Sequence, residues 1–305
     1  MARLAALDVG SNTVHVLVTD VVRGKLEDVA HFVEMPELGP QVARTGAIGD
    51  RARPALRAVR KVLAEARKHG YETLIACATE AVRQASDGEE FARKAEAVLG
   101  VPLRIISGER EAELSFLGAA SRHASRREWA LIDLGGGSTE VVIAREREIL
   151  RSTKLAIGSG VLAATYLSDP PRPEERARLR WAALRAMSGA PDGEVERLVA
   201  TGGTASNLPG VLARRNPPPV LTTADLLVCE ARLDRGRARR VAEEVGLPPA
   251  RVKALRAGVE ALLLFLDWYG LATLHVSHEG LRHGMLLAFL ERGEEWWRDR
   301  PHDIR

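Results

Sequence analysis

The sequence is short of cysteine and of long apolar runs, and each shortage excludes a class of protein. Cys77 and Cys229 are its two cysteines, in none of the paired spacings that bind zinc or build a disulfide framework. We expect both to be buried, reduced thiols in a cytoplasmic protein. The longest aliphatic runs, residues 262–266 and 285–290, are far shorter than a membrane span. Asp8 interrupts the apolar N-terminal stretch before the core of a signal peptide could form.

An excess of charge of one sign is also missing. The chain has 44 Lys and Arg against 41 Asp and Glu, a formal net charge of +3 over 305 residues. This balance gives no reason to expect electrostatic attraction to nucleic acid or to an anionic membrane, so we expect neither as a partner. Lysine is scarce, with six residues among the 44 basic ones, and no Walker A motif with its lysine occurs.

The sequence does contain a repeated segment. Residues 7–18 read LDVGSNTVHVLV and residues 132–143 read IDLGGGSTEVVI, which aligns Asp8 with Asp133. In each copy an apolar run ends in Asp, a turn of small residues follows and a β-branched run returns. This pattern is typical of a hairpin whose tip approaches something closely. The duplication predicts two related domains.

Helix and strand patterns alternate through the rest of the chain, with Ser86 and Glu89 predicting a capping box. Together with the two hairpins, this alternation predicts an α/β fold with a cleft between two domains. The polar stretch at residues 121–128 gives the expected division into residues 1–124 and 125–305. The predicted helices cover residues 54–69, 86–99, 109–120, 251–269 and 280–291, and the predicted strands cover residues 73–78, 103–106, 197–200 and 273–277.

The strongest local signal for chemistry is DLGGGSTE at residues 133–140. Three consecutive glycines let backbone N–H groups approach an anion, and the hydroxyls of Ser138 and Thr139 add donors. The carboxylates of Asp133 and Glu140 are hard oxygen ligands suited to Mg²⁺. A simple Gly-rich turn is the alternative, but the flanking acids and the repeated copy favour a phosphate-binding cradle.

Two further Gly-containing turns are weaker signals. The first hairpin carries DVGSNT at residues 8–13, whose residues are ordinary turn formers when taken alone. The segment ATGGTASN at residues 200–207 offers further N–H donors, but a helix start capped by Thr204 or Ser206 is equally open. These turns are therefore candidates for phosphate binding that need support from elsewhere in the chain.

Two patterns that resemble cofactor sites lack the required context. Residues 158–163 fit G-x-G-x-x-A, but no acidic residue follows at the distance that a dinucleotide site needs, so we predict a strand-to-helix turn. The spacing of His275, His278 and His283 matches no pattern of metal ligands. We expect these histidines to be solvated or part of the core.

Seven segments follow one another in order over essentially the whole chain: LDVGSNTVHVLV, ATEAVRQA (78–85), ISGEREAELSFLG (106–118), LIDLGGGSTEVVIA (131–144), LAIGSGVLAATYL (155–167), ATGGTASN and SHEGLRHGML (277–286). Together they resemble the exopolyphosphatase and guanosine pentaphosphate phosphatase family. The resemblance implies the short two-domain form, without a C-terminal HD-type domain. It also implies two ribonuclease H-like domains around a cleft, as in the superfamily of actin, sugar kinases and heat-shock chaperones.

The resemblance implies hydrolysis of the terminal phosphoanhydride bond of inorganic polyphosphate, with short chains expected, or the same reaction on guanosine pentaphosphate. Mg²⁺ is the implied cofactor, and a homodimer is compatible with the family. Glu111, in the E-A-x-L position, would activate the attacking water, and Thr79 and Arg83 would meet phosphate oxygens. With the turns described above, the candidate phosphate-binding residues are Gly10, Ser11, Asn12, Thr13, Thr79, Arg83, Gly135, Gly136, Gly137, Ser138, Thr139, Gly202, Gly203 and Thr204, and the candidate metal ligands are Asp8, Asp133 and Glu140.

Two positions depart from the family, and two other function classes stay open. His283 stands where an acidic residue is common, and Glu37 stands where a basic one is frequent, which affects the expected contacts to a long polyphosphate. A sugar kinase or actin-like ATPase would share both hairpins, but the E-A-x-L segment argues against it. A silent sensor of polyphosphate or nucleotide would bind without turnover and would have no need of Glu111.

Overall fold

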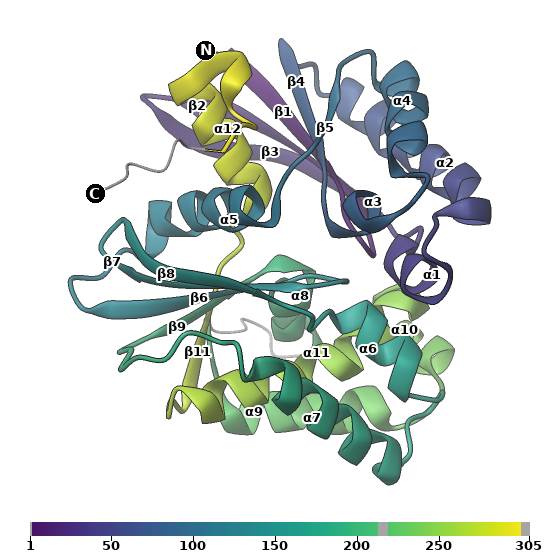
Figure 1. The fold of residues 1–305 in the computed structure, drawn as a ribbon, viewed down its shortest axis with the longest axis vertical. Coiled ribbons are helices and arrows are strands. Elements are labelled where there is room, and N and C mark those ends of the chain that lie inside the picture. The colour runs from purple at the N-terminus through teal and green to yellow at the C-terminus, as the bar shows by residue number, and fades with distance from the viewer. Residues whose placement is uncertain (1, 213–218, 300–305) are drawn as a thin grey trace.

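The computed structural model describes residues 2–212 and 219–299 and contains two β-sheets, one from each half of the chain (Figure 1). The first sheet has five strands in the order β3-β2-β1-β4-β5. Strands β1, β2 and β3 are antiparallel neighbours, whereas β4 and β5 run parallel to β1. Their bounds are β1 Ala2–Val9, β2 Val14–Val22, β3 Lys25–Glu34, β4 Thr73–Ala78 and β5 Leu103–Ile105.

The second sheet repeats this arrangement, in the order β10-β11-β9-β6-β7-β8. Here β6, β7 and β8 are antiparallel neighbours, β9 and β11 run parallel to β6, and β10 is an added edge strand. Asp8 lies opposite His15 in the first hairpin and Asp133 lies opposite Glu140 in the second. The repeat confirms the predicted pair of ribonuclease H-like folds. The bounds are β6 Glu128–Leu134, β7 Thr139–Arg145, β8 Glu148–Leu155, β9 Leu198–Thr201, β10 Val220–Thr222 and β11 Thr273–Val276.

The first sheet is covered on one face by helices from its own half. The apolar side of α2, with Val59, Val62 and Leu63, packs into a core with residues of β1 and β2, as its 3.6-residue period predicts. Gly100 ends α4 in the left-handed conformation expected of a helix C-terminus. The bounds are α1 Leu38–Thr45, the 3₁₀ turn η1 Gly49–Arg51, α2 Ala52–Arg67, α3 Glu80–Gln84 and α4 Gly88–Leu99.

The predicted capping box at the start of α4 is wrong. Asp87, not Ser86, stands at the N-cap, and no side-chain cap bond forms there. The Asp87 carboxylate instead accepts hydrogen bonds from the backbone N–H groups of Ile48 and Gly49. This tertiary contact ties the turn after α1 to α4, and it replaces the local bond that the sequence pattern suggests.

Helices also cover the second sheet, and α11 lies in the middle of the hydrophobic core that they form with it. This long apolar helix is buried over most of its length, as predicted from residues 251–269. The prediction for the cysteines is confirmed, because both Cys77 and Cys229 are buried and neither forms a disulfide bond. The bounds are α6 Ser159–Tyr166, α7 Pro173–Met187, α8 Gly202–Val211, α9 Thr223–Asp234, α10 Ala238–Val245 and α11 Pro249–Trp268.

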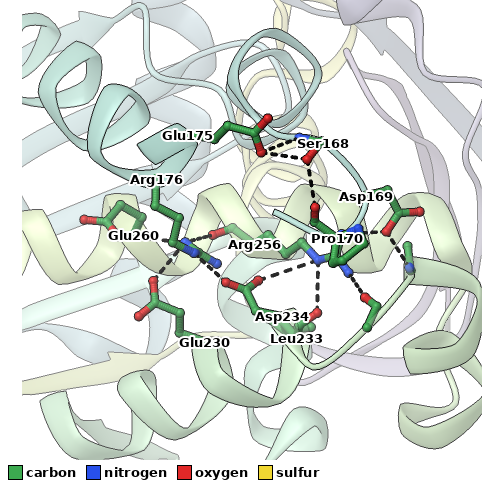
Figure 2. A network of polar contacts seen from close by, with 12 residues as sticks. Ser168, Asp169, Pro170, Glu175, Arg176, Glu230, Leu233, Asp234, Arg256 and Glu260 are labelled. Atoms are coloured by element: carbon green, nitrogen blue, oxygen red, sulfur yellow. Dashed lines mark hydrogen bonds and ion pairs between the residues drawn. The ribbon is translucent and has the colours of Figure 1, made fainter. Parts of the chain in front are cut away.

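A buried arginine connects α11 to the loops around it. Arg256 is almost completely buried, and its guanidinium donates to the Asp169 carboxylate and to the backbone oxygen of Leu233 (Figure 2). In the same network Arg176 of α7 pairs with Glu230 and Asp234 of α9. Because each buried charge has a partner, these residues hold the outer helices in place without an uncompensated charge.

Two helices lie between the sheets. α5, Gly108–His123, packs Phe116 and Ala119 against the second sheet, while Leu114 joins a cluster with the first sheet and α12. α12, Leu281–Arg292, is followed by the 3₁₀ turn η2, Gly293–Glu295, and returns from the second half of the chain to the first sheet (Figure 1). The division at residues 124 and 125 stays a prediction.

The contact between α5 and α12 brings backbone against backbone. A Cβ added to Gly284 would overlap the carbonyl oxygen of Leu114, and one added to Gly118 would overlap that of Gly280. Only glycine permits these helices to approach so closely. Within residues 2–212 and 219–299, every helix is too short or too polar to cross a bilayer.

The substitution Gly284→Ala tests this contact. The added methyl group meets backbone, which cannot rotate away, so the variant should lose at least about 1–3 kcal/mol of stability. Thermal unfolding followed by circular dichroism measures the loss. Gly210→Ala in α8 is the control, since no atom lies within 4 Å of a Cβ there. Equal melting temperatures for Gly284→Ala and the wild type would contradict the close packing of α5 and α12.

Candidate active site

A cavity of about 440 Å³ opens where the carboxyl ends of β1, β4, β6 and β9 face one another. This is the edge at which α/β proteins commonly bind ligands. We call it the interdomain cavity. Of the predicted site residues, those that line it are Asp8, Gly10, Ser11, Asn12, Thr13, Thr79, Glu111, Asp133, Gly135, Gly136, Gly137, Ser138, Glu140, Gly202 and Gly203.

Three predicted phosphate-binding residues do not line the interdomain cavity. The hydroxyl of Thr139 is buried and donates to the backbone oxygen of Ile157. Thr204 is buried against Gly258 of α11, and the N-cap of α8 is Thr201 rather than Thr204. Arg83 lies behind the cavity wall, where it contacts Glu111.

The tips of the two hairpins touch each other. The side chain of Asn12 packs so closely on Gly136 and Gly160 that a Cβ on either glycine would overlap it. Ser11 packs on Gly137 in the same way. Residues 158–163 lie at the predicted change from strand to helix, with Gly158 as the N-cap of α6 and residues 159–163 in its first turns. Their role in the contact between hairpin tips is a function that the sequence analysis missed, because it depends on tertiary proximity.

Glu111 lies in the first turn of α5, after Ser107, whose hydroxyl caps the helix by accepting from the N–H of Arg110. The Glu111 side chain faces the cavity but is only 8% exposed. Burial raises the pKa of its carboxyl to about 7, a shift opposed by Arg83 3.3 Å away and reinforced by the charge of Asp133. A carboxyl that titrates near neutral pH is suited to accept a proton from water.

The three candidate metal ligands are all buried, and burial raises the pKa of each. Asp8 forms an ion pair with Arg282, Asp133 accepts a hydrogen bond from Ser115, and Glu140 accepts one from Ser138 at 2.8 Å. Mutual repulsion contributes, because Asp133 and Glu111 further raise the pKa of Glu140. A divalent cation among these oxygens would offset that repulsion.

These carboxylates do not form a complete cage for a metal. Among the described residues, no group of three or more His, Cys, Asp or Glu side chains is arranged to hold an ion on its own. Mg²⁺ usually binds through one or two carboxylates and takes its other ligands from water and from phosphate groups. The donor set therefore fits Mg²⁺ that arrives with a phosphorylated ligand.

Arg251 is a further cavity residue that the sequence analysis missed. It lies in the first turn of α11, is 8% exposed, and its guanidinium lies against Gly203. Burial and the neighbouring charge of Arg282 lower its pKa to about 10, so it stays protonated at neutral pH. Within the described residues it has no ion pair or hydrogen bond. A buried cation without a counter-ion indicates an anionic ligand.

The two departures from the family pattern lie in different places. His283 lines the interdomain cavity, and its Nε2 is 2.9 Å from the Asp28 carboxylate of β3. Glu37 precedes α1 in a left-handed conformation and lines a second cavity, of about 690 Å³, between α1, α6 and α11. His15, also missed, has a buried Nε2 without a partner among the described residues, and burial lowers its pKa well below the usual value.

Comparisons with known proteins agree on one family. The family model described as the Ppx/GppA phosphatase family matches residues 17–293. An uncharacterized protein of Streptomyces coelicolor is 32% identical over 316 residues, which cover 97% of this chain and 92% of that protein. The Aquifex aeolicus PPX-GPPA enzyme is 27% identical with a TM-score of 0.74, over 94% of this chain and 99% of that one. An exopolyphosphatase from Cytophaga hutchinsonii is 22% identical with a TM-score of 0.85, over 95% and 98%, which shows likeness of fold.

Replacing Arg251 by Met should stabilise the free protein and weaken anion binding. Removal of a buried charge without a partner should add about 1–3 kcal/mol to the free energy of unfolding, while inorganic phosphate should bind at least about tenfold more weakly. Chemical denaturation and isothermal titration calorimetry measure the two effects. Arg178→Met, at an exposed position, is the control. Unchanged phosphate binding in Arg251→Met would exclude a ligand at this guanidinium.

Proposed function

Because the chain belongs to the Ppx/GppA phosphatase family, we propose that it is an exopolyphosphatase that releases the terminal orthophosphate of inorganic polyphosphate. One observation carries the proposal: Glu111, with its pKa of about 7, faces the same cavity as the glycine turns of both hairpins and Arg251, which has no ion pair within residues 2–212 and 219–299. Such a phosphoanhydride hydrolase needs these three elements, a base for water, N–H donors for phosphate and a positive charge.

Binding would depend on charge neutralisation, because the substrate is almost entirely negative. The glycines of the Gly135–Gly137 turn, with Gly202 and Gly203, have no side chain of their own and line the cavity. The Gly135 N–H donates to the Ser138 carbonyl oxygen, so Gly136 and Gly137 are the candidate N–H donors of this turn. Arg251 adds a positive charge from the α11 side. We propose that these groups hold the terminal phosphoryl group, with Ser11, Thr13 and Thr79 as further donors around it.

Glu111 would act on the attacking water. Its carboxylate accepts a proton from the water while the water oxygen bonds to the terminal phosphorus and the bridging P–O bond breaks. Orthophosphate and a chain shortened by one unit leave, and the proton passes from Glu111 to a product oxygen or to solvent. Arg83, 3.3 Å from the Glu111 carboxylate, orients the base without entering the cavity.

We propose Mg²⁺ as the cofactor, held by oxygens of Asp8, Asp133 and Glu140 together with those of the substrate and water. When bound, it would neutralise charge on the phosphoryl group. Burial raises the pKa of the Asp8 carboxyl, and the ion pair with Arg282 opposes that rise. A homodimer, a cytoplasmic location and the absence of nucleic acid and membrane partners stay predictions.

Orthophosphate release with Mg²⁺ from tripolyphosphate, long-chain polyphosphate and guanosine pentaphosphate, measured in parallel, tests the function. We expect turnover of polyphosphate, and a loss of about 10²–10⁴-fold in Glu111→Gln with substrate binding retained. Glu109→Gln, on the exposed side of the same helix, is the control. Faster turnover of guanosine pentaphosphate would reassign the substrate. No release from any of them would favour a kinase or a sensor, and an active Glu111→Gln would remove Glu111 from the role of base.

The kcat/KM of the same reaction should fall as the pH decreases. Glu111 must be deprotonated to act, and its pKa is about 7, so kcat/KM should fall about tenfold for each pH unit below that value. A profile of kcat/KM between about pH 5 and 8 measures the acidic limb. A flat profile over this interval would show that no group with a pKa near 7 limits the reaction.

A further inference from the structure

A row of four alternating charges leads from Lys154 to Glu111 at the wall of the interdomain cavity, which Glu80 and Glu111 line. Lys154 of β8 forms an ion pair with Glu80, and Glu80 pairs with Arg83 at 2.5 Å. Arg83 in turn contacts the Glu111 carboxylate at 3.3 Å. We call Lys154, Glu80, Arg83 and Glu111 the charge row. Glu80 and Arg83 belong to α3 and Glu111 to α5, so Lys154 is the member that comes from the second sheet.

The path of Lys154 fixes it close to the base. Its aliphatic stem crosses Gly108, the first residue of α5, where a Cβ would lie 3.0 Å from the Lys154 Cδ. The side chains of Lys154 and Glu80 are 31% and 10% exposed, so this ion pair is shielded from water much more than an ordinary surface pair. Lys154 is one of only six lysines in the chain.

We propose that Lys154 and Glu80 are positioning residues that set the charge of Glu111, in part through Arg83, and couple it to the approach of the two sheets. This inference rests on the proposed role of Glu111 as the base. With Lys154 present, its charge neutralises Glu80, and the guanidinium of Arg83 can neutralise Glu111. Without Lys154, two carboxylates share one guanidinium. Without Glu80, two cations compete for the single carboxylate of Glu111.

The two substitutions should therefore act in opposite directions. Loss of the Lys154 charge makes ionisation of Glu111 less favourable, and loss of the Glu80 charge makes it more favourable. Other charges also face Glu111, namely Asp133 of β6 and Glu140 of β7. The charge of Lys154 also lowers the pKa of Glu111 and of Glu140 directly, so Lys154→Met acts on Glu111 both along the charge row and across the cavity. Glu80→Gln is therefore the variant that reports on the charge row.

The acidic limb of the kcat/KM profile gives the first readout. We expect Lys154→Met to move it toward higher pH and Glu80→Gln toward lower pH, each by about half to one unit, and the double variant to lie near the wild type. Lys154→Arg keeps the positive charge, so the acidic limb of its profile should lie close to that of the wild type. Lys94→Met, which breaks an exposed pair with Glu90, is the control. Shifts in the same direction, or none, would overturn the proposal.

Thermal unfolding gives a second readout that needs no turnover. The pKa of Glu111 is raised in the folded state, so its ionisation costs stability as pH rises toward that pKa, and Glu111→Gln should stabilise the protein more at high pH than at low pH. The pH at which this gain levels off should rise in a Lys154→Met background and fall in a Glu80→Gln background. If the pH at which the gain levels off moves as expected in a protein that releases no phosphate, the proposed role of Glu111 as base fails but the charge row stands. If that pH is the same in all backgrounds of an active enzyme, the charge row fails.

Discussion

The backbone contact between α5 and α12 is the constraint on which the position of the proposed catalytic groups depends. Gly118 and Gly284 allow the helices to meet without intervening side chains. The first turn of α5 carries Glu111, and the first turn of α12 carries Arg282, which pairs with Asp8. One junction between the sheets therefore places both the proposed base and the cation that neutralises a strand-end carboxylate.

The interdomain cavity is lined by buried acidic and basic groups whose charged forms are disfavoured by burial. Burial raises the pKa of Asp8, Asp133 and Glu140, and it lowers that of Arg251. Buried charges that lack a partner of opposite sign lower the free energy of unfolding. A phosphate chain that arrives with a divalent cation supplies charges of both signs at once. This physical complementarity explains why the same residues both destabilise the free protein and suit a polyanionic substrate.

Local sequence patterns predicted the hairpins and the glycine turns that line the cavity, because a strand that ends in Asp before a small-residue turn specifies both backbone path and chemistry. Thr79 and Glu111 were predicted from the family resemblance. The patterns failed where tertiary contacts decide. Thr139 carries a hydroxyl of the expected type, but its place in the strand directs it to the backbone oxygen of Ile157. Arg251 and Lys154 lie in unremarkable stretches, and only folding brings them to the site. Asp87 similarly takes distant backbone partners in place of a local cap.

The contact between hairpin tips has a consequence for how the cavity can change. Gly136 and Gly160 meet Asn12 with no side chain of their own, so substitution at either glycine can only add atoms between the tips. Each added atom would push Asn12 away from these glycines and so separate the first hairpin tip from the second half of the chain. The width of the cleft is thus adjustable from these positions in graded steps, from alanine upward, while the acids, the base and the arginines keep their chemical identity.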